Sequence, residues 1–178
     1  ISTFRKYIPA GFGASSALAN LIIQEGKLHL RRMALDATLS EIRGGSETGL
    51  LQKISLEAQV RDVIVKLDAE GALPLREVRG EVTLDKGTIG FADFRVNYGN
   101  TQLNSIEGSY AIGERKLEAH GRGDLDLAEV REQMKIGIIP AEAVRLVSTV
   151  QEFGGRAGAD LSVRWGKDAP LQFQGRLS

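Results

Sequence analysis

The feature that most restricts how this chain can fold is a short strand pattern that occurs twice. The pattern occupies residues 78–84 (VRGEVTL) and, 28 positions later (106 minus 78), residues 106–112 (IEGSYAI). Both copies read apolar, charged, glycine, polar or charged, apolar, small, apolar. Successive side chains of an extended chain point to opposite faces, so each copy has one apolar and one polar face. The sequence therefore predicts a repeated β-strand unit with one apolar face.

Alternating apolar and polar residues predict further strands on either side of the two copies. The segment 21–39 reads as a hairpin with a turn at Gly26. The segment 54–69 reads as a strand pair whose apolar phase changes at Arg61 and Asp62, and such a change requires a tight bend or a β-bulge. The remaining expected strands are the returns of the two copies and a closing hairpin, at residues 89–98, 117–127, 157–165 and 171–177.

Helical patterns are few. Residues 14–21 fit a short helix, and residues 43–49, rich in Gly and Ser, fit a surface turn. Asp126 followed by Glu129 fits a capping box, in which the aspartate accepts hydrogen bonds from amides of the first helical turn. Residues 140–153 predict a second, amphipathic helix that starts with a proline and ends before two glycines.

Composition restricts the class of protein. The 178 residues include 42% hydrophobic and 26% charged residues, which is the balance of a folded domain. Lys plus Arg equal Asp plus Glu at 23 each, so there is no basic surplus of the kind that nucleic acid requires. The absence of cysteine excludes disulfides and thiolate chemistry. No spanning helix or signal peptide is visible, and the chain begins at Ile1, so we expect a piece of a longer protein.

The order of these motifs resembles that of the AsmA-like proteins of Gram-negative envelopes. The resemblance covers nearly the whole chain, and structural glycines and alternating strands carry it. In chain order the motifs are a short helical start, a glycine-turned hairpin, the repeated strand, a helix start and a closing strand, at residues 1–20, 25–28, 78–84 with 106–112, 124–127 and 155–161.

The resemblance implies a fold and a setting. The fold is mainly β with one or two helices: an elongated, curved antiparallel sheet that forms a trough with an apolar lining. The setting is the periplasm, in an inner-membrane-anchored protein that handles lipid and contributes to outer-membrane homeostasis. The missing N-terminal anchor would place this piece in the middle or C-terminal part of such a protein. A single domain is expected, with an N-terminal segment, repeated strands, a helical insert and a closing hairpin at residues 1–20, 21–126, 127–154 and 155–178.

An open apolar trough would bind acyl chains. Burial of each methylene stabilises binding by about 0.8 kcal/mol, so a dozen would hold a lipid without a specific headgroup contact. About ten strands spaced at about 4.8 Å would make a trough roughly 45 to 50 Å long. The expected groove residues are Ile54, Leu56, Val60, Val65, Val78, Val82, Leu84, Phe94, Val96, Ile106, Tyr110, Ile112, Val163 and Phe173.

Two alternatives stay open at this level. The same alternation would be seen if these residues formed a closed core, because any half-buried sheet shows it. The sheet could also serve as an interaction scaffold for outer-membrane assembly, without bound lipid, whose open edges pair with neighbouring repeats or a partner strand.

The sequence offers no reactive signature. His29 and His120 are isolated, and such histidines are usually surface or packing residues. Asp124, with the two capping carboxylates, lacks the regular loop of a calcium site, and residues 11–16 lack the third glycine and the lysine of phosphate-binding turns. We therefore expect no enzyme activity, no cofactor and no metal. The expected partners are an acyl lipid such as phospholipid and neighbouring repeats of the parent protein, with no nucleic acid.

Overall fold

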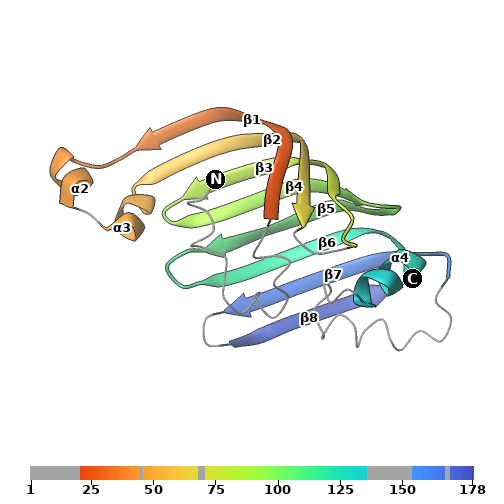
Figure 1. Cartoon of the computed structure of the whole chain (residues 1–178). Coiled ribbons are helices and arrows are strands. Elements are labelled where there is room, and N and C mark those ends of the chain that lie inside the picture. The colour runs from red at the N-terminus through yellow and green to blue at the C-terminus, as the bar shows by residue number, and fades with distance from the viewer. Residues whose placement is uncertain (1–20, 45, 68–70, 136–153, 167–168) are drawn as a thin grey trace.

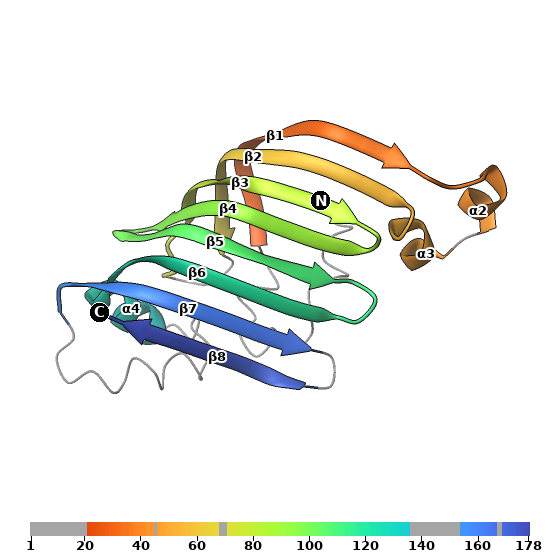
Figure 2. The same ribbon diagram turned by 180° about the vertical axis from the view of Figure 1, so that it is seen from behind.

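The protein, seen here as a computed structural model, folds into a single curved sheet with short helices (Figures 1 and 2). The structure describes residues 21–44, 46–67, 71–135, 154–166 and 169–178. The strands are β1 (Leu21–Leu35), β2 (Ile54–Leu67), β3 (Leu75–Asp85), β4 (Thr88–Tyr98), β5 (Thr101–Ala111), β6 (Lys116–Asp126), β7 (Arg156–Gly166) and β8 (Ala169–Leu177). The helices are α2 (Leu39–Gly44), α3 (Glu47–Leu51) and α4 (Leu127–Lys135).

The eight strands lie in one open antiparallel sheet in the order in which they occur in the chain. This confirms the expected fold class, a curved, trough-like antiparallel sheet built from hairpins. Two details differ from expectation. The described residues form eight strands rather than about ten, which at about 4.8 Å per spacing gives a sheet about 34 Å across. They also form three short helices rather than one or two.

The two copies of the repeated pattern are β3 and β5. Each is the first strand of a hairpin, and β4 and β6 are the corresponding returns. The unit that repeats is therefore a hairpin. The antiparallel pairing continues beyond each hairpin, because β4 pairs with β5 and β6 pairs with β7.

A row of β-bulges bends one part of the sheet. The register shifts in every pairing from β1–β2 to β5–β6, whereas β6 and β7 pair without a shift along their whole contact. Three bulge residues, Asp62, Glu77 and Asp93, have φ of 52°, 52° and 54°, and Gly26 on β1 has φ of 142°. Bulges increase strand bending, and bulges on adjacent strands act together. Beyond them the ends of β1–β4 turn sharply to one side (Figures 1 and 2).

The bulges also correct two predictions from the sequence. The expected hairpin in residues 21–39 is wrong, because Gly26 lies inside the single strand β1. It is located at a β-bulge of this strand rather than in a turn. The expected strand pair in residues 54–69 is one strand, β2, and the phase change at Arg61 and Asp62 is the bulge alternative. In both cases the extra residue restores the apolar side chains to the same face.

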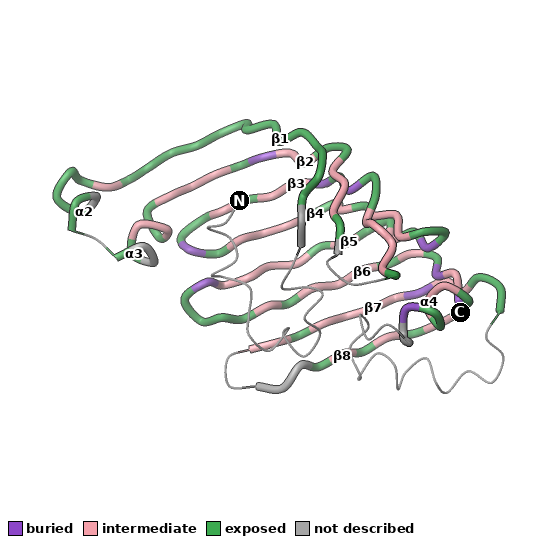
Figure 3. Tube along the Cα trace, viewed as in Figure 1, coloured by how far each residue is buried: buried purple, intermediate pink, exposed green. Residues whose placement is uncertain are grey.

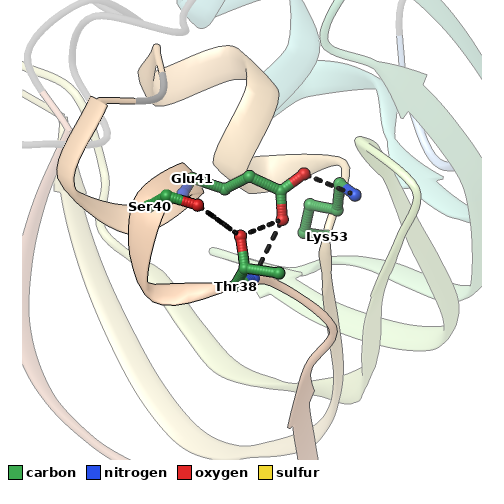
Figure 4. A network of polar contacts seen from close by, with 4 residues as sticks. All are labelled: Thr38, Ser40, Glu41 and Lys53. Atoms are coloured by element: carbon green, nitrogen blue, oxygen red, sulfur yellow. Dashed lines mark hydrogen bonds and ion pairs between the residues drawn. The ribbon is translucent and has the colours of Figure 1, made fainter.

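Residues 43–49 were expected to be a surface turn, but residues 43 and 44 end the helix α2 and residues 47–49 belong to the helix α3. Thr38 caps α2: its backbone N–H donates to Glu41 Oε2 at 2.9 Å, and its Oγ1 accepts from the Glu41 N–H at 3.3 Å. Lys53 lies 3.2 Å from the other carboxylate oxygen of Glu41 (Figure 4). The Thr38 hydrogen bond, followed by Lys53, lowers the pKa of Glu41 from its ordinary value. The spacing Thr-x-x-Glu is the sequence signal for this helix start.

The predicted capping box at α4 is half correct. Asp126 Oδ1 accepts hydrogen bonds from the N–H groups of Ala128 and Glu129, at 3.0 and 3.1 Å. The Glu129 carboxylate does not return to Asp126, whose own N–H donates to Thr101 Oγ1 at 3.0 Å. The Glu129 carboxylate instead accepts hydrogen bonds from the turn between β4 and β5. The helices predicted at 14–21 and 140–153 lie outside the described residues, apart from Leu21, which begins β1.

Candidate functional site

The pairing register places most apolar side chains of the eight strands on one face of the sheet. One lateral row shows this directly, because each member is the Cα partner of the next: Leu30, Ala58, Val82, Phe91, Gly108, Ala119, Val163 and Phe173. We call the opposite side of the sheet the outer face, and we call this side the inner face. Its apolar members are Ile23, Leu28, Leu30, Met33 and Leu35 on β1; Ile54, Leu56, Ala58, Val60, Val63 and Val65 on β2; Leu75, Val78, Val82 and Leu84 on β3; Ile89, Phe91, Phe94, Val96 and Tyr98 on β4; Leu103, Ile106 and Tyr110 on β5; Leu117, Ala119 and Leu125 on β6; Ala157, Ala159, Leu161, Val163 and Trp165 on β7; and Phe173 and Leu177 on β8.

All the groove residues expected from the sequence lie on the inner face except Ile112. Ile112 follows the end of β5, and its N–H donates to the Gly87 carbonyl oxygen at 2.9 Å. Val78 and Ile112 are buried, and the other expected residues are half-buried. The structure therefore brings these side chains together on one surface.

The sequence-based set missed the most exposed part of the inner face. On β1, Leu28 is 69% exposed and Met33 is 60% exposed, and Ile23, Leu30 and Leu35 are also exposed. Interpreting β1 as a hairpin had hidden its contribution. A one-residue phase change between Leu30 and Met33, like the one on β2, was the signal that could have revealed a single strand.

The inner face is most exposed on β1, whereas its described apolar residues on β2 to β8 are half-buried or buried. Figure 3 shows exposed residues along the whole described length of β1 and buried ones close to α4. No side chain of the described residues is completely buried, and the largest buried cluster is small, with Leu125, Leu127 and Ala159 at its centre. The described part of the chain therefore has no closed core of the size that a two-layer sandwich would bury.

Helix α4 covers one end of the inner face. Leu127 and Val130 pack with Leu103, Leu125 and nearby residues of β7 and β8. This helix lies on the side toward which the ends of β1–β4 turn, so the inner face is the concave one (Figures 1 and 2). The trough is therefore narrowed at the bent end and open along β1.

Two polar contacts fix α4 to the bent end of the sheet. The hydroxyl of Tyr98, on the inner face of β4, donates to the amide oxygen of Gln133 and accepts from the Leu73 N–H at 3.3 Å. Burial raises the pKa of Tyr98 above its ordinary value of 10.0. Glu129 accepts the N–H of Asn100 at 2.8 Å and the N–H of Thr101 at 3.2 Å.

Glycines of the repeated pattern leave room for aromatic rings on the inner face. A Cβ built on Gly108 would lie 2.7 Å from the ring of Phe91, and Gly80 has the same relationship to Phe94. The two rings meet edge to face, with centroids 6.3 Å apart and an interplanar angle of 88°. The glycines therefore leave space for two aromatic rings on the inner face, within the bend.

The outer face is mostly polar, and some of its charged groups pair with one another. His120 Nε2 lies 2.7 Å from Asp160 Oδ1, and Arg122 Nε donates to Asp160 Oδ2 at 2.9 Å. Hydrogen bonds from His120, and then Arg122, hold the pKa of Asp160 below its ordinary value of 3.8. His29 is exposed on the outer face of β1, opposite Gln59.

The described residues contain no group of three or more histidine, cysteine or acidic side chains arranged to hold a metal ion. Asp124 is exposed, and Asp126 and Glu129 serve α4 as described above. Within the same part of the chain, no helix is both long and apolar enough to cross a membrane.

Comparisons with protein-family models, curated proteins and solved structures find no match to this chain. The geometry of the sheet is therefore the basis for the functional argument.

Proposed function

We propose that the inner face binds the acyl chains of a lipid, and that the protein acts by binding rather than by catalysis. One observation carries this proposal: apolar side chains from eight neighbouring strands share one concave face, and those of β1 remain largely exposed. Continuous exposed apolar surfaces of this kind usually mark a site for an apolar partner. The resemblance to AsmA-like proteins adds the proposed setting, which is phospholipid handling between two membranes in the periplasm.

The shape of the inner face suits an extended chain. Rows of apolar side chains run across the strands, so an acyl chain lying across the sheet would touch a new apolar residue about every 4.8 Å. Each methylene removed from water contributes about 0.8 kcal/mol. A lipid held in this way needs no specific headgroup contact on the inner face.

Lipid extraction and native mass spectrometry of the purified protein test the proposal directly. The wild-type protein is expected to carry phospholipid. Val82→Asp places a carboxylate in the middle of the inner face and should reduce the bound lipid. Thr83→Asp, its neighbour on the outer face of the same strand, is the matched control and should retain it.

A second pair of variants keeps the test valid if Val82→Asp does not fold. Leu28 is 69% exposed, so Leu28→Asp should affect the fold little while placing a charge at the open side of the trough. His29→Asp is its outer-face control. If the folded inner-face variants carry as much of the same lipid as their controls, the inner face is not the binding surface.

Trp165 offers an independent measurement. It is the only tryptophan in the chain, and it lies on the inner face of β7. Lipids brominated along the acyl chain should quench the fluorescence of Trp165 strongly. Lipids brominated on the headgroup, which stays in solution, should quench it weakly. Equal quenching by both would argue against acyl chains on the inner face.

The alternative function is an interaction scaffold, and the open edges of the sheet favour it. Within the described part of the chain, β1 and β8 each pair on one side only, and β1 runs for 15 residues. An exposed edge can accept a strand from a neighbouring repeat or a partner. This alternative predicts no bound lipid, together with crosslinks between β1 and another polypeptide.

A further inference from the structure

The outer face contains a charged hollow at the bend of the sheet, and it is separate from the inner face. Its volume is about 570 Å³. Its charged lining comes from three adjacent strands and consists of Arg61, Asp62, Arg79, Glu81, Asp93 and Arg95. Both aspartates are bulge residues with positive φ, so the bend itself determines where they lie.

The register places cations side by side across this hollow. Arg79 and Arg95 are direct Cα partners on β3 and β4, and Lys27 and Arg61 are direct partners on β1 and β2. Val60 pairs with Gly80, and the next residues outward on the two strands are Arg61 and Arg79. Four cationic residues therefore form a row across four strands. Like charges directly opposite on neighbouring strands destabilise a sheet.

Among the described residues, the arginines of this row lack the carboxylate partners that Arg31 and Arg122 have on the same face. Arg31 binds Glu81 at 2.7 Å, and Arg122 binds Asp160 at 2.9 Å. Within the described part of the chain, Arg79 and Arg95 form no ion pair.

The remaining charged groups of the hollow are also unpaired with one another. Arg61 donates only to Gln59 Oε1, at 2.9 and 2.5 Å, among the described residues. Asp62 and Asp93 form no ion pair with a described residue either, and Glu81 is already bound to Arg31. The hollow therefore holds cations and carboxylates that form no ion pairs with each other among the described residues.

We propose that this hollow binds a phosphate ester that also carries an amine. The phosphate would lie between the Arg79 and Arg95 guanidinium groups, whose planar donors suit its oxygens. The ammonium group would lie beside Asp62 and Asp93. The three arginines of the hollow, with Lys27 beside Arg61 on the neighbouring strand β1, exceed the two free carboxylates, and this surplus fits a phosphate, with nearly two negative charges, better than a single carboxylate.

This proposal does not rest on lipid binding by the inner face, because the two sites are on opposite sides of the sheet. The same chemistry occurs in a soluble phosphate ester and in the headgroup of an aminophospholipid. Phosphoethanolamine in solution represents the first source, and phosphatidylethanolamine vesicles represent the second.

Isothermal titration calorimetry with phosphoethanolamine tests the site in the full chain. Phosphoethanolamine is expected to bind more tightly than inorganic phosphate. Arg79→Gln and Arg95→Gln should each weaken binding by about tenfold, the effect of one lost charge-assisted contact of about 1.4 kcal/mol. Arg164→Gln, on the outer face of β7 and remote from the hollow, is the control and should leave the affinity unchanged.

A carboxylate variant tests the other half of the site. Asp93→Asn should weaken binding of phosphoethanolamine while leaving or improving binding of inorganic phosphate. Cosedimentation with phosphatidylethanolamine vesicles, lost in Arg79→Gln, would assign the headgroup as the source, and binding of the soluble ester alone would assign a free molecule. The proposal is overturned by no binding of phosphoethanolamine at millimolar concentration, by equal binding of inorganic phosphate, or by arginine variants that bind as the wild type does.

Discussion

The ring of Phe94 fills the space that a side chain at Gly80 would need: a Cβ built on Gly80 would lie 2.3 Å from Cδ2 of Phe94. Gly80 belongs to the first copy of the repeated pattern, and Phe94 to the strand that pairs with it. The absence of a side chain on one strand therefore determines how an aromatic ring packs on the next, at the point where the sheet bends.

Gly80→Ala should destabilise the protein by about 1 to 3 kcal/mol, because the new methyl group overlaps the Phe94 ring. Chemical denaturation measures the change in unfolding free energy. Gly121→Ala is the control, since its Cβ would lie at an ordinary 3.5 Å from Ile106 Cγ1. Equal effects of the two substitutions would contradict the packing argument. Phe94→Leu should reduce the cost of Gly80→Ala when the two are combined.

The bulge at Asp62 should tolerate glycine and reject a β-branched residue. Its φ of 52° costs an ordinary L-residue roughly 1 to 2 kcal/mol, and a β-branched residue is a true outlier there. Asp62→Gly is therefore expected to be neutral or stabilising, and Asp62→Val destabilising, in thermal or chemical unfolding. Glu57→Val, on the same strand without a positive φ, should cost little. A harmless Asp62→Val would mean that the bulge is not fixed.

Glu129→Gln should loosen the attachment of α4 to the turn between β4 and β5. The carboxylate accepts backbone N–H groups of Asn100 and Thr101, and hydrogen bonds to a charged acceptor are about twice as strong as neutral ones. We expect a loss of about 1 kcal/mol. Amide hydrogen exchange at Asn100 and Thr101 should become faster. Glu114→Gln, in the turn between β5 and β6, is the control and should leave both amides protected.

Asp160 should make stability depend on acid pH. His120 and Arg122 lower its pKa in the folded chain below the ordinary 3.8, so its contribution is present above that value and is lost as the pH falls through the folded pKa. Asp160→Asn should lower the melting temperature near neutral pH, and the difference should vanish in strong acid. Asp124→Asn, exposed on the same face of β6, is the control. A difference that stays constant with pH would show that these contacts do not stabilise the fold.

The local features of the inner face were predictable. Alternation between residues 78 and 84, or 106 and 112, assigns a face to each side chain because the period of a strand is two wherever the strand pairs. The phase change at Arg61 and Asp62 indicated a tight bend or a bulge, and the structure has the bulge. The spacing of Thr38 and Glu41 is also a local signal, because it is the capping-box pattern that starts α2.

Other features depended on contacts between distant residues. The sequence indicated that Glu129 follows an aspartate at the spacing of a capping box, but not that the Asn100 amide would compete for its carboxylate. It also could not show that Arg79 and Arg95 would be opposite each other, because a register between two strands is a property of the pair.

For most of β3 to β8 the sequence by itself determined which residues form strands and which side chains share a face, because both follow from the local period of an extended chain. Only the tertiary structure decided that the bulges of neighbouring strands align into one bend, that the apolar face lies inside this bend and that β1 leaves it open. Alignment of bulges requires the strands to pair in a particular register, and pairing is set by contacts between segments that are far apart in the chain.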